Sequence, residues 1–209
     1  MKKSLFPRLA LMAVVVALVS ACSEKKFEYT NVIPANASTV VSINMKSLVD
    51  KAGLNDKENK EVQEKLTNAL KSGMNAATFQ QVEMIMKDPK KSGIDVSAPL
   101  YVFNTETFPT TVIAKVSNED DLHALLETLE KEKVCQPLAS GDGFQFTQMG
   151  NQVFMAYTPS VLMLTNYKGT TQLEKIKQDI PALLKQTNEN SIVSTAVFKK
   201  MQKMGGDID

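Results

Sequence analysis

The chain of 209 residues has no tryptophan, one histidine and two cysteines. A Ser-His-Asp enzyme or a histidine-based metal site would therefore depend on His123 alone. If Cys22 is modified, Cys135 has no partner and no intrachain disulfide is expected. The formal net charge is only +1, so no basic excess indicates a nucleic-acid partner.

Short motifs that carry chemistry are also missing. The sequence has no glycine-rich phosphate loop, no His-Glu-x-x-His, no Cys-x-x-Cys and no Gly-x-Ser-x-Gly. Ser23 and Lys26 have the spacing of a Ser/Lys dyad, but they lie in a short polar segment where no rigid scaffold orients them. We therefore predict no catalytic residue, no metal ligand and no cofactor.

The N-terminus resembles a targeting signal. Lys2, Lys3 and Arg8 form a cationic start, and Leu9 to Val19 is an unbroken apolar run. This run is too short to cross a bilayer, which takes about 20 apolar residues as a helix. A charged start, a short apolar stretch and small residues at its end predict a secretory signal peptide over residues 1–21.

The residues Val19-Ser20-Ala21-Cys22 refine this prediction, because they resemble a bacterial lipobox. The resemblance implies cleavage between Ala21 and Cys22, with a diacylglyceryl thioether and an acylated amine (palmitate-type chains) on Cys22. Several acyl chains make a durable anchor, since each buried methylene adds about 0.8 kcal/mol. The alternative is an ordinary signal peptide followed by a free cysteine.

Residues 22–28 then form a short polar tether that keeps the domain close to its membrane. Ser23 is not the Asp that resembles an inner-membrane retention signal, so we expect the outer membrane, in either its periplasmic or its surface leaflet. Removing the signal peptide leaves a slightly acidic chain that is long enough for one good core.

Hydrophobic periodicity predicts alternating strands and helices. Helices are expected over 46–52, from Asn55 or Asp56 to Gly73, around Phe79–Met86, from Asn118 onward, from Thr171 onward and around Val197–Met201. In the helix from Thr171, Thr171 and Glu174 form a capping box, and Pro181 is expected to kink or break the helix. Strands are expected over Thr39–Met45, Leu100–Phe103, Thr111–Val116, Phe144–Met149, Gln152–Tyr157 and Val161–Thr165.

Two segments share one pattern, a hairpin followed by a capped helix, at 100–132 and at 152–186. Each such ββα unit would add two antiparallel strands and a covering helix. The predicted fold class is α+β, an antiparallel sheet built from ββα-like units with helices mainly on one face, over residues 29–209.

The last residues, Asp207-Ile208-Asp209, have the character of a beginning strand after the break at Gly205-Gly206. We therefore expect the domain to be truncated at its C-terminus, as the front part of a longer protein. If further strands normally pair with this sheet, an exposed edge remains that can accept a partner strand.

Two stretches carry a family resemblance: Tyr29 to Leu48, directly after the lipobox, and Phe198 to Ile208. They resemble a family of uncharacterised lipoproteins of Bacteroides-type bacteria that share a domain of unknown function. Members of this family are longer than this chain, which agrees with truncation. The family has no established activity, so the resemblance implies no catalytic residues.

Several residues invite functional interpretations that have simpler alternatives. Cys135 is either a reactive thiol or, as we expect, a small buried hydrophobe after a helix. His123 lies between Glu119 and Glu127 on a helix, and we expect a solvated side chain rather than a catalytic base. Glu119, Asp120 and Asp121 complement the helix dipole in a first turn and point in different directions, so they do not converge on one metal ion.

Methionines together with Phe144, Phe146 and Phe154 could line a flexible hydrophobic groove, but their alternation with polar residues favours ordinary core packing.

The function we expect is a non-enzymatic cell-envelope lipoprotein, a membrane-tethered binding or assembly module with a protein or polymer partner. The alternatives are a lipid-anchored periplasmic or surface hydrolase whose site is not visible in linear sequence, and a truncated product without an independent role. Two carboxylates converging in one cleft would favour the hydrolase.

Overall fold

The computed structural model describes residues 28–51, 60–73, 76–204 and 208. The predicted signal peptide, Cys22 and all of the tether except Glu28 lie outside the described residues, so their assignments stay predictions.

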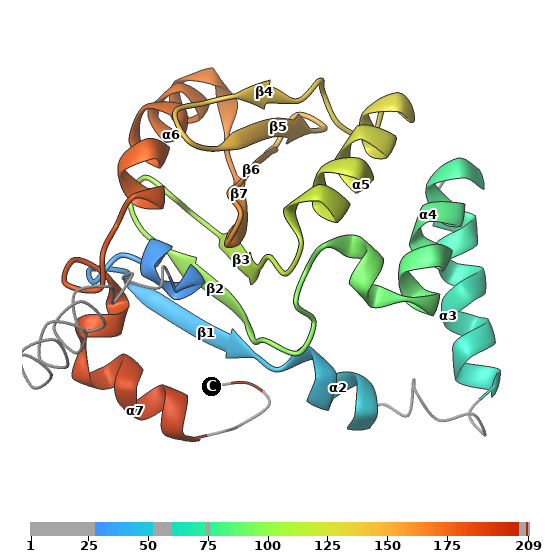
Figure 1. The fold of residues 1–209 in the computed structure, drawn as a ribbon, viewed down its shortest axis with the longest axis horizontal. Coiled ribbons are helices and arrows are strands. Elements are labelled where there is room, and N and C mark those ends of the chain that lie inside the picture. Colours follow the sequence, from blue (N-terminus) through green and yellow to red (C-terminus); the bar gives the residue numbers. More distant parts are fainter. Residues whose placement is uncertain (1–27, 52–59, 74–75, 205–207, 209) are drawn as a thin grey trace, which may run out of the picture.

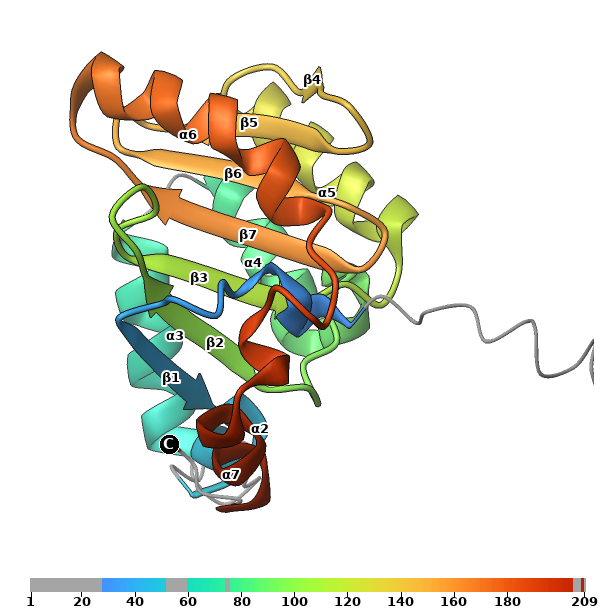
Figure 2. The ribbon, with the colours of Figure 1, turned by 90° about the vertical axis from the view of Figure 1, so that its left-hand side faces the viewer.

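One antiparallel sheet organises the described residues (Figures 1 and 2). Its seven strands lie in the order β1-β2-β3-β7-β6-β5-β4, so β1 and β4 are the edges. The strands are β1 (Thr39–Ile43), β2 (Leu100–Asn104), β3 (Thr111–Lys115), β4 (Ala139–Ser140), β5 (Gln145–Met149), β6 (Val153–Tyr157) and β7 (Val161–Asn166). The predicted α+β class and the antiparallel sheet are confirmed.

The two predicted hairpin–helix units are present and adjacent. β2 and β3 pair with each other and lead into α5 (Glu119–Lys131), while β6 and β7 pair and lead into α6 (Gly169–Leu184). The units join through β3 and β7, which pair antiparallel from Thr111↔Thr165 to Lys115↔Val161. The sheet therefore grows by adding hairpins, as the repeated pattern predicts.

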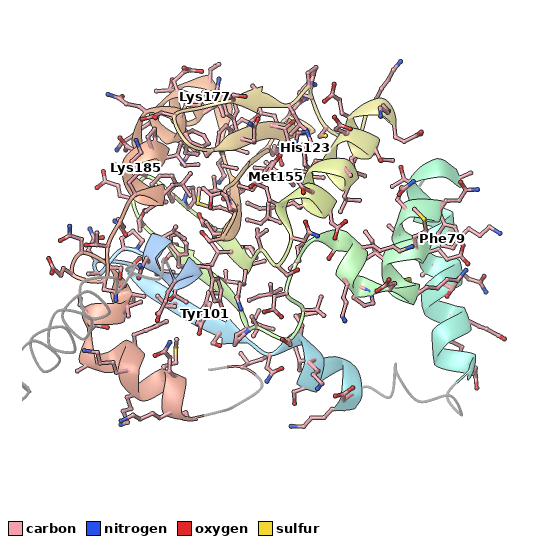
Figure 3. The ribbon with its side chains drawn as sticks, in the orientation of Figure 1. Phe79, Tyr101, His123, Met155, Lys177 and Lys185 are labelled. Carbon is pink, nitrogen blue, oxygen red and sulfur yellow. The ribbon has the colours of Figure 1, made fainter. Side chains whose placement is uncertain are left out.

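The larger core lies on one face of the sheet, under α6, α7 (Ala196–Met204) and the short 3-10 helices η1 (Tyr29–Val32) and η3 (Ile192–Ser194). Ile176 and Ile180 of α6 are fully buried there against strand residues such as Phe103. Tyr101 of β2 packs its ring 5.5 Å from that of Phe198 in α7, centroid to centroid (Figure 3).

The opposite face carries a second core under α5, in which Leu122 and Leu126 are buried against strand residues that include Met155 and Leu162. The helices thus cover both faces, whereas the sequence pattern suggested mainly one. The reason lies in β7, whose Val-Leu-Met-Leu run is buried or half-buried throughout, because successive side chains of a strand point to opposite faces.

A helical segment between β1 and β2 comprises α2 (Met45–Lys51), α3 (Lys60–Gly73), α4 (Ala76–Lys87) and η2 (Pro89–Ser92). α4 contacts α3 and η2, and η2 in turn contacts α5. Gly93 makes that last contact possible: its φ is +71°, and a Cβ there would lie 2.4 Å from the Asn118 carbonyl oxygen. Phe79 and Val82 are half-buried as expected, but Met86 is 45% exposed.

The helix starts show one correct and one wrong prediction. Asn118 caps α5, since its Oδ1 accepts hydrogen bonds from the backbone N–H groups of Asp120 (3.0 Å) and Asp121 (3.3 Å). The capping box of Thr171 with Glu174 is wrong, because α6 already begins at Gly169. Glu174 instead pairs with Lys177 on the next turn.

Gln172 takes part of the capping role at the start of α6, because its Oε1 accepts the Lys168 backbone N–H at 2.6 Å. A break at Pro181 is also wrong, since α6 continues through this residue to Leu184. Burial of five apolar side chains on one stripe of the helix outweighs the single backbone hydrogen bond that proline removes. These residues are Leu173, Ile176, Ile180, Leu183 and Leu184.

Candidate functional site

The edge strand β1 is the first candidate surface. On its inner side it pairs with β2 over its whole length, from Thr39↔Asn104 to Ile43↔Leu100. On its outer side, within the described residues, only Ile208 pairs with it, through an antiparallel bridge to Ile43. The predicted strand character of the 207–209 segment is thus visible at Ile208, the one residue of it that the structure describes.

The bonds across the sheet show which backbone groups of β1 point outward. Asn166 donates its backbone N–H to the Thr110 carbonyl, so even-numbered residues at β3 face β7 and odd-numbered residues face β2. The register Tyr101↔Ile113 then makes odd-numbered residues of β2 face β3 and even-numbered residues face β1.

The same alternation continues into β1. Thr39, Val41 and Ile43 stand opposite even-numbered β2 residues and therefore bond β2. Val40 and Ser42 consequently direct their N–H and C=O groups away from the sheet. Because Ile43 itself bonds β2, its bridge to Ile208 is made by the outward groups that flank it, which include the Ser42 carbonyl. Among the described residues, the N–H and C=O of Val40 and the N–H of Ser42 therefore form the open part of the edge.

Two further features of β1 and its surroundings are typical of a surface that binds another polypeptide. β1 has the sequence Thr-Val-Val-Ser-Ile, without the lysine or proline that often protects edge strands from pairing. Exposed apolar side chains also occur on the segments around it: Val197 is 78% exposed and Met204 64% exposed on α7, and Ile208 is 61% exposed.

A pocket lined by two carboxylates is the second candidate surface. It has a volume of about 310 Å³ and lies between the β2–β3 turn, the loop after η1 and the C-terminal half of α6. Its polar lining consists of Asn36, Thr105, Glu106, Thr107, Asp179 and Gln186, and its apolar lining consists of Pro34, Phe108, Ala182 and Leu183. Glu106 and Asp179, which are far apart in the sequence, are the two carboxylates of this lining.

The only histidine is half-exposed and takes part in a chain of three side chains. His123 Nδ1 lies 2.6 Å from the Tyr157 hydroxyl, and its Nε2 lies 3.5 Å from Glu127 Oε1. Burial raises the pKa of Tyr157, so the hydroxyl stays protonated and can donate to Nδ1. His123 therefore reaches from α5 to β6 (Figure 3), and the expectation of a merely solvated side chain missed this contact.

Within the described residues, the hydrogen-bond partner of His123 is a tyrosine hydroxyl rather than a serine, threonine or cysteine. Tyr157 could not be paired with it from sequence, because 34 residues separate them and only the strand order brings them together. The contact holds α5 on the second face of the sheet.

The remaining predicted residues occupy structural positions. Cys135 is 7% exposed and its pKa is raised by burial, which agrees with a small buried hydrophobe. Glu119, Asp120 and Asp121 form the first turn of α5. In the part of the chain that the structure describes, no group of three or more metal-ligating side chains comes together.

The aromatic cluster behaves as core. Phe144 is 8% exposed and Phe154 only 1% exposed, and Phe146 stacks on Phe154 with ring centroids 5.5 Å apart.

No helix among the described residues has the length and apolarity that crossing a membrane requires.

In the part of the chain that the structure describes, the protein has an α+β fold with a two-faced antiparallel sheet, an edge strand β1 whose outer side carries the bridge to Ile208, and a pocket lined by two carboxylates. Residues 29–209 match the family described as "Domain of unknown function (DUF4836)", and the chain belongs to this family. The predicted membership of a family that shares a domain of unknown function is confirmed. No curated protein and no solved structure matches the chain.

Proposed function

We propose that this protein is a lipid-anchored cell-envelope module that binds another polypeptide, without catalysis, by accepting an extended strand at β1. The observation that carries the proposal is the set of outward-facing groups on β1, the N–H and C=O of Val40 and the N–H of Ser42, beside an antiparallel bridge that Ile208 already makes at Ile43. An added strand gains main-chain hydrogen bonds from the edge and side-chain specificity from the surfaces around it.

The membrane tether rests on the lipobox-like residues 19–22. Acyl chains on Cys22 would hold the domain at the outer membrane, and the short segment 22–28 would keep it near the lipid surface. A tether this short raises the local concentration of the β1 edge for partners in the same membrane.

Binding at the edge also buries apolar surface. A strand alongside β1 would lie near Ile208 and α7, where Val197 and Met204 are largely exposed. Burial of such side chains contributes about 25 cal/mol per Å² of apolar area, which adds to the directional main-chain bonds.

The test uses the full-length protein in its native envelope, with a photo-cross-linking amino acid at Thr39, an exposed residue of β1. A control carries the same amino acid at Ser140, an exposed residue of the opposite edge strand β4. We expect one discrete protein adduct from position 39 and none from position 140. The substitution Ser42→Pro removes an outward N–H and should abolish the adduct.

Equal adducts from both edges, or an adduct that persists with Ser42→Pro, would contradict strand addition at β1. The anchor is tested on the same cells with an alkynyl fatty acid. Label should appear on the wild-type chain and be absent from Cys22→Ala, whereas labelling of both would contradict lipidation at Cys22.

A second candidate, a lipid-anchored hydrolase, draws support from the pocket that contains Glu106 and Asp179. One carboxyl group would serve as acid and the other as base. Panels of nitrophenyl glycosides and esters, assayed with wild type, Glu106→Gln and Asp179→Asn, test this use. Turnover that both substitutions abolish would favour the hydrolase, and a rate unchanged by them would contradict it.

A further inference from the structure

We propose that the pocket between α6 and the β2–β3 turn is a binding site for an organic cation, an ammonium or guanidinium group on a short apolar stem. This site is independent of the β1 edge and of the function proposed for it. The argument rests on the charge of the lining, on hydrogen-bonding capacity that the protein leaves unused, and on the shape of the apolar wall.

The charge of the lining is negative and uncompensated. Glu106 is exposed and Asp179 is half-buried, and neither forms an ion pair with a lysine in the described part of the chain. The lining includes no lysine or arginine. Lys185, directly after α6, is engaged with Asp142 instead, and Lys177 of α6 with Glu174; Figure 3 labels both lysines.

The pocket also has spare hydrogen-bond acceptors. Asp179 accepts one hydrogen bond through Oδ2, from the Thr107 hydroxyl at 3.2 Å, and among the described residues its Oδ1 accepts none. Gln186, which follows the C-terminal end of α6, also lines the pocket, and its Oε1 is buried without any hydrogen-bond partner. A buried acceptor without a partner is costly, and such a group calls for a donor that the protein itself does not supply.

Acceptors and negative charge together select a ligand rich in N–H donors. An ammonium group has three donors and a guanidinium group has five, and neither accepts a hydrogen bond. The apolar part of the lining, which includes Pro34 and Leu183, fits the methylene stem of such a group. The volume of about 310 Å³ accommodates one side-chain-sized ligand.

Two sources share this chemistry: a basic side chain displayed by a partner protein and a free amine. The probes are N-acetyl-arginine methylamide, its neutral isostere N-acetyl-citrulline methylamide, and putrescine. Each is titrated into the full-length protein in detergent micelles, and the signals of the Gln186 side-chain amide and of the Thr107 backbone amide are followed by NMR.

We expect the arginine amide to shift both signals and the citrulline amide to leave them in place. Asp179→Asn should weaken binding about tenfold, because a charge-assisted hydrogen bond is lost. Gln186→Leu should weaken it less, since it removes a neutral acceptor. Glu174→Gln is the matched control, since it removes one charge from the same helix outside the pocket and should leave binding unchanged.

Tighter binding of the arginine amide than of putrescine assigns the pocket to a displayed side chain, and the reverse assigns it to a free amine. Equal shifts with the arginine and citrulline probes would overturn the proposal, as would undiminished binding by Asp179→Asn. Neither result bears on strand addition at β1, which the cross-linking experiment tests separately.

Discussion

The middle of the sheet and its β1 edge both consist largely of apolar strand residues but lie in different surroundings. In β7 the side chains of Val161 and Met163 are completely buried, because α6 covers one face and α5 the other. In β1 no side chain is fully buried, and Thr39 is exposed. Similar strand residues thus contribute stability in one place and leave an accessible backbone in the other.

The difference shows that stability and binding capacity are separated along the sheet. The central strands have neighbours on both sides and helices on both faces, so their backbone groups are all engaged. β1 has a neighbour on one side only, apart from the bridge to Ile208. The larger core nevertheless reaches this edge, since it includes Tyr101 and Phe103 of β2 and Val40 packs against it.

The largest expected effect separates two adjacent residues of β1 itself. Val41→Pro removes an N–H that bonds β2 and should lower the free energy of unfolding by about 3 kcal/mol or more. Ser42→Pro removes an outward N–H and should cost about 1 kcal/mol or less, since proline is tolerated at edge positions that face solvent. Urea unfolding followed by circular dichroism measures both.

The two proline variants also act as controls for each other, because they place the same residue one position apart. Equal destabilisation by both would show that the outward N–H of Ser42 is engaged in the folded protein. The main-chain groups of β1 would then be as fully bonded as those of the central strands.

A smaller effect compares one substitution in two strands. Val161→Ala in β7 removes fully buried methyl groups and should cost about 2–3 kcal/mol, including the cavity it leaves. Val41→Ala in β1 removes half-buried methyl groups and should cost about 1 kcal/mol or less. The midpoints of denaturant unfolding give the two values, and similar losses would mean that β1 is as well packed as the centre.

Much of the fold followed from local patterns. The hairpins at 100–116 and 152–165 were predictable because alternating apolar residues and turn residues act over short distances. The cap at Asn118 was predictable for the same reason. The helix start at Gly169 was not, because Gln172 provides its contact from inside the helix rather than from the usual capping position.

Features that depend on strand order could not be predicted. The burial of the sheet on both faces depends on where α5 and α6 cross it, and neither crossing is encoded in the helix patterns themselves. The contact of His123 with Tyr157 depends on α5 lying over β6. Likewise, Glu106 and Asp179 share a pocket only because α6 packs beside the β2–β3 turn.

The most direct test of the account is amide hydrogen exchange along β1, measured by NMR on the full-length protein in detergent micelles without a partner. The account predicts fast exchange at Val40 and Ser42 and slow exchange at Val41 and Ile43, because only the latter two donate to β2. Slow exchange at all four amides would show that the edge is already covered, and would contradict the proposal that β1 accepts a partner strand.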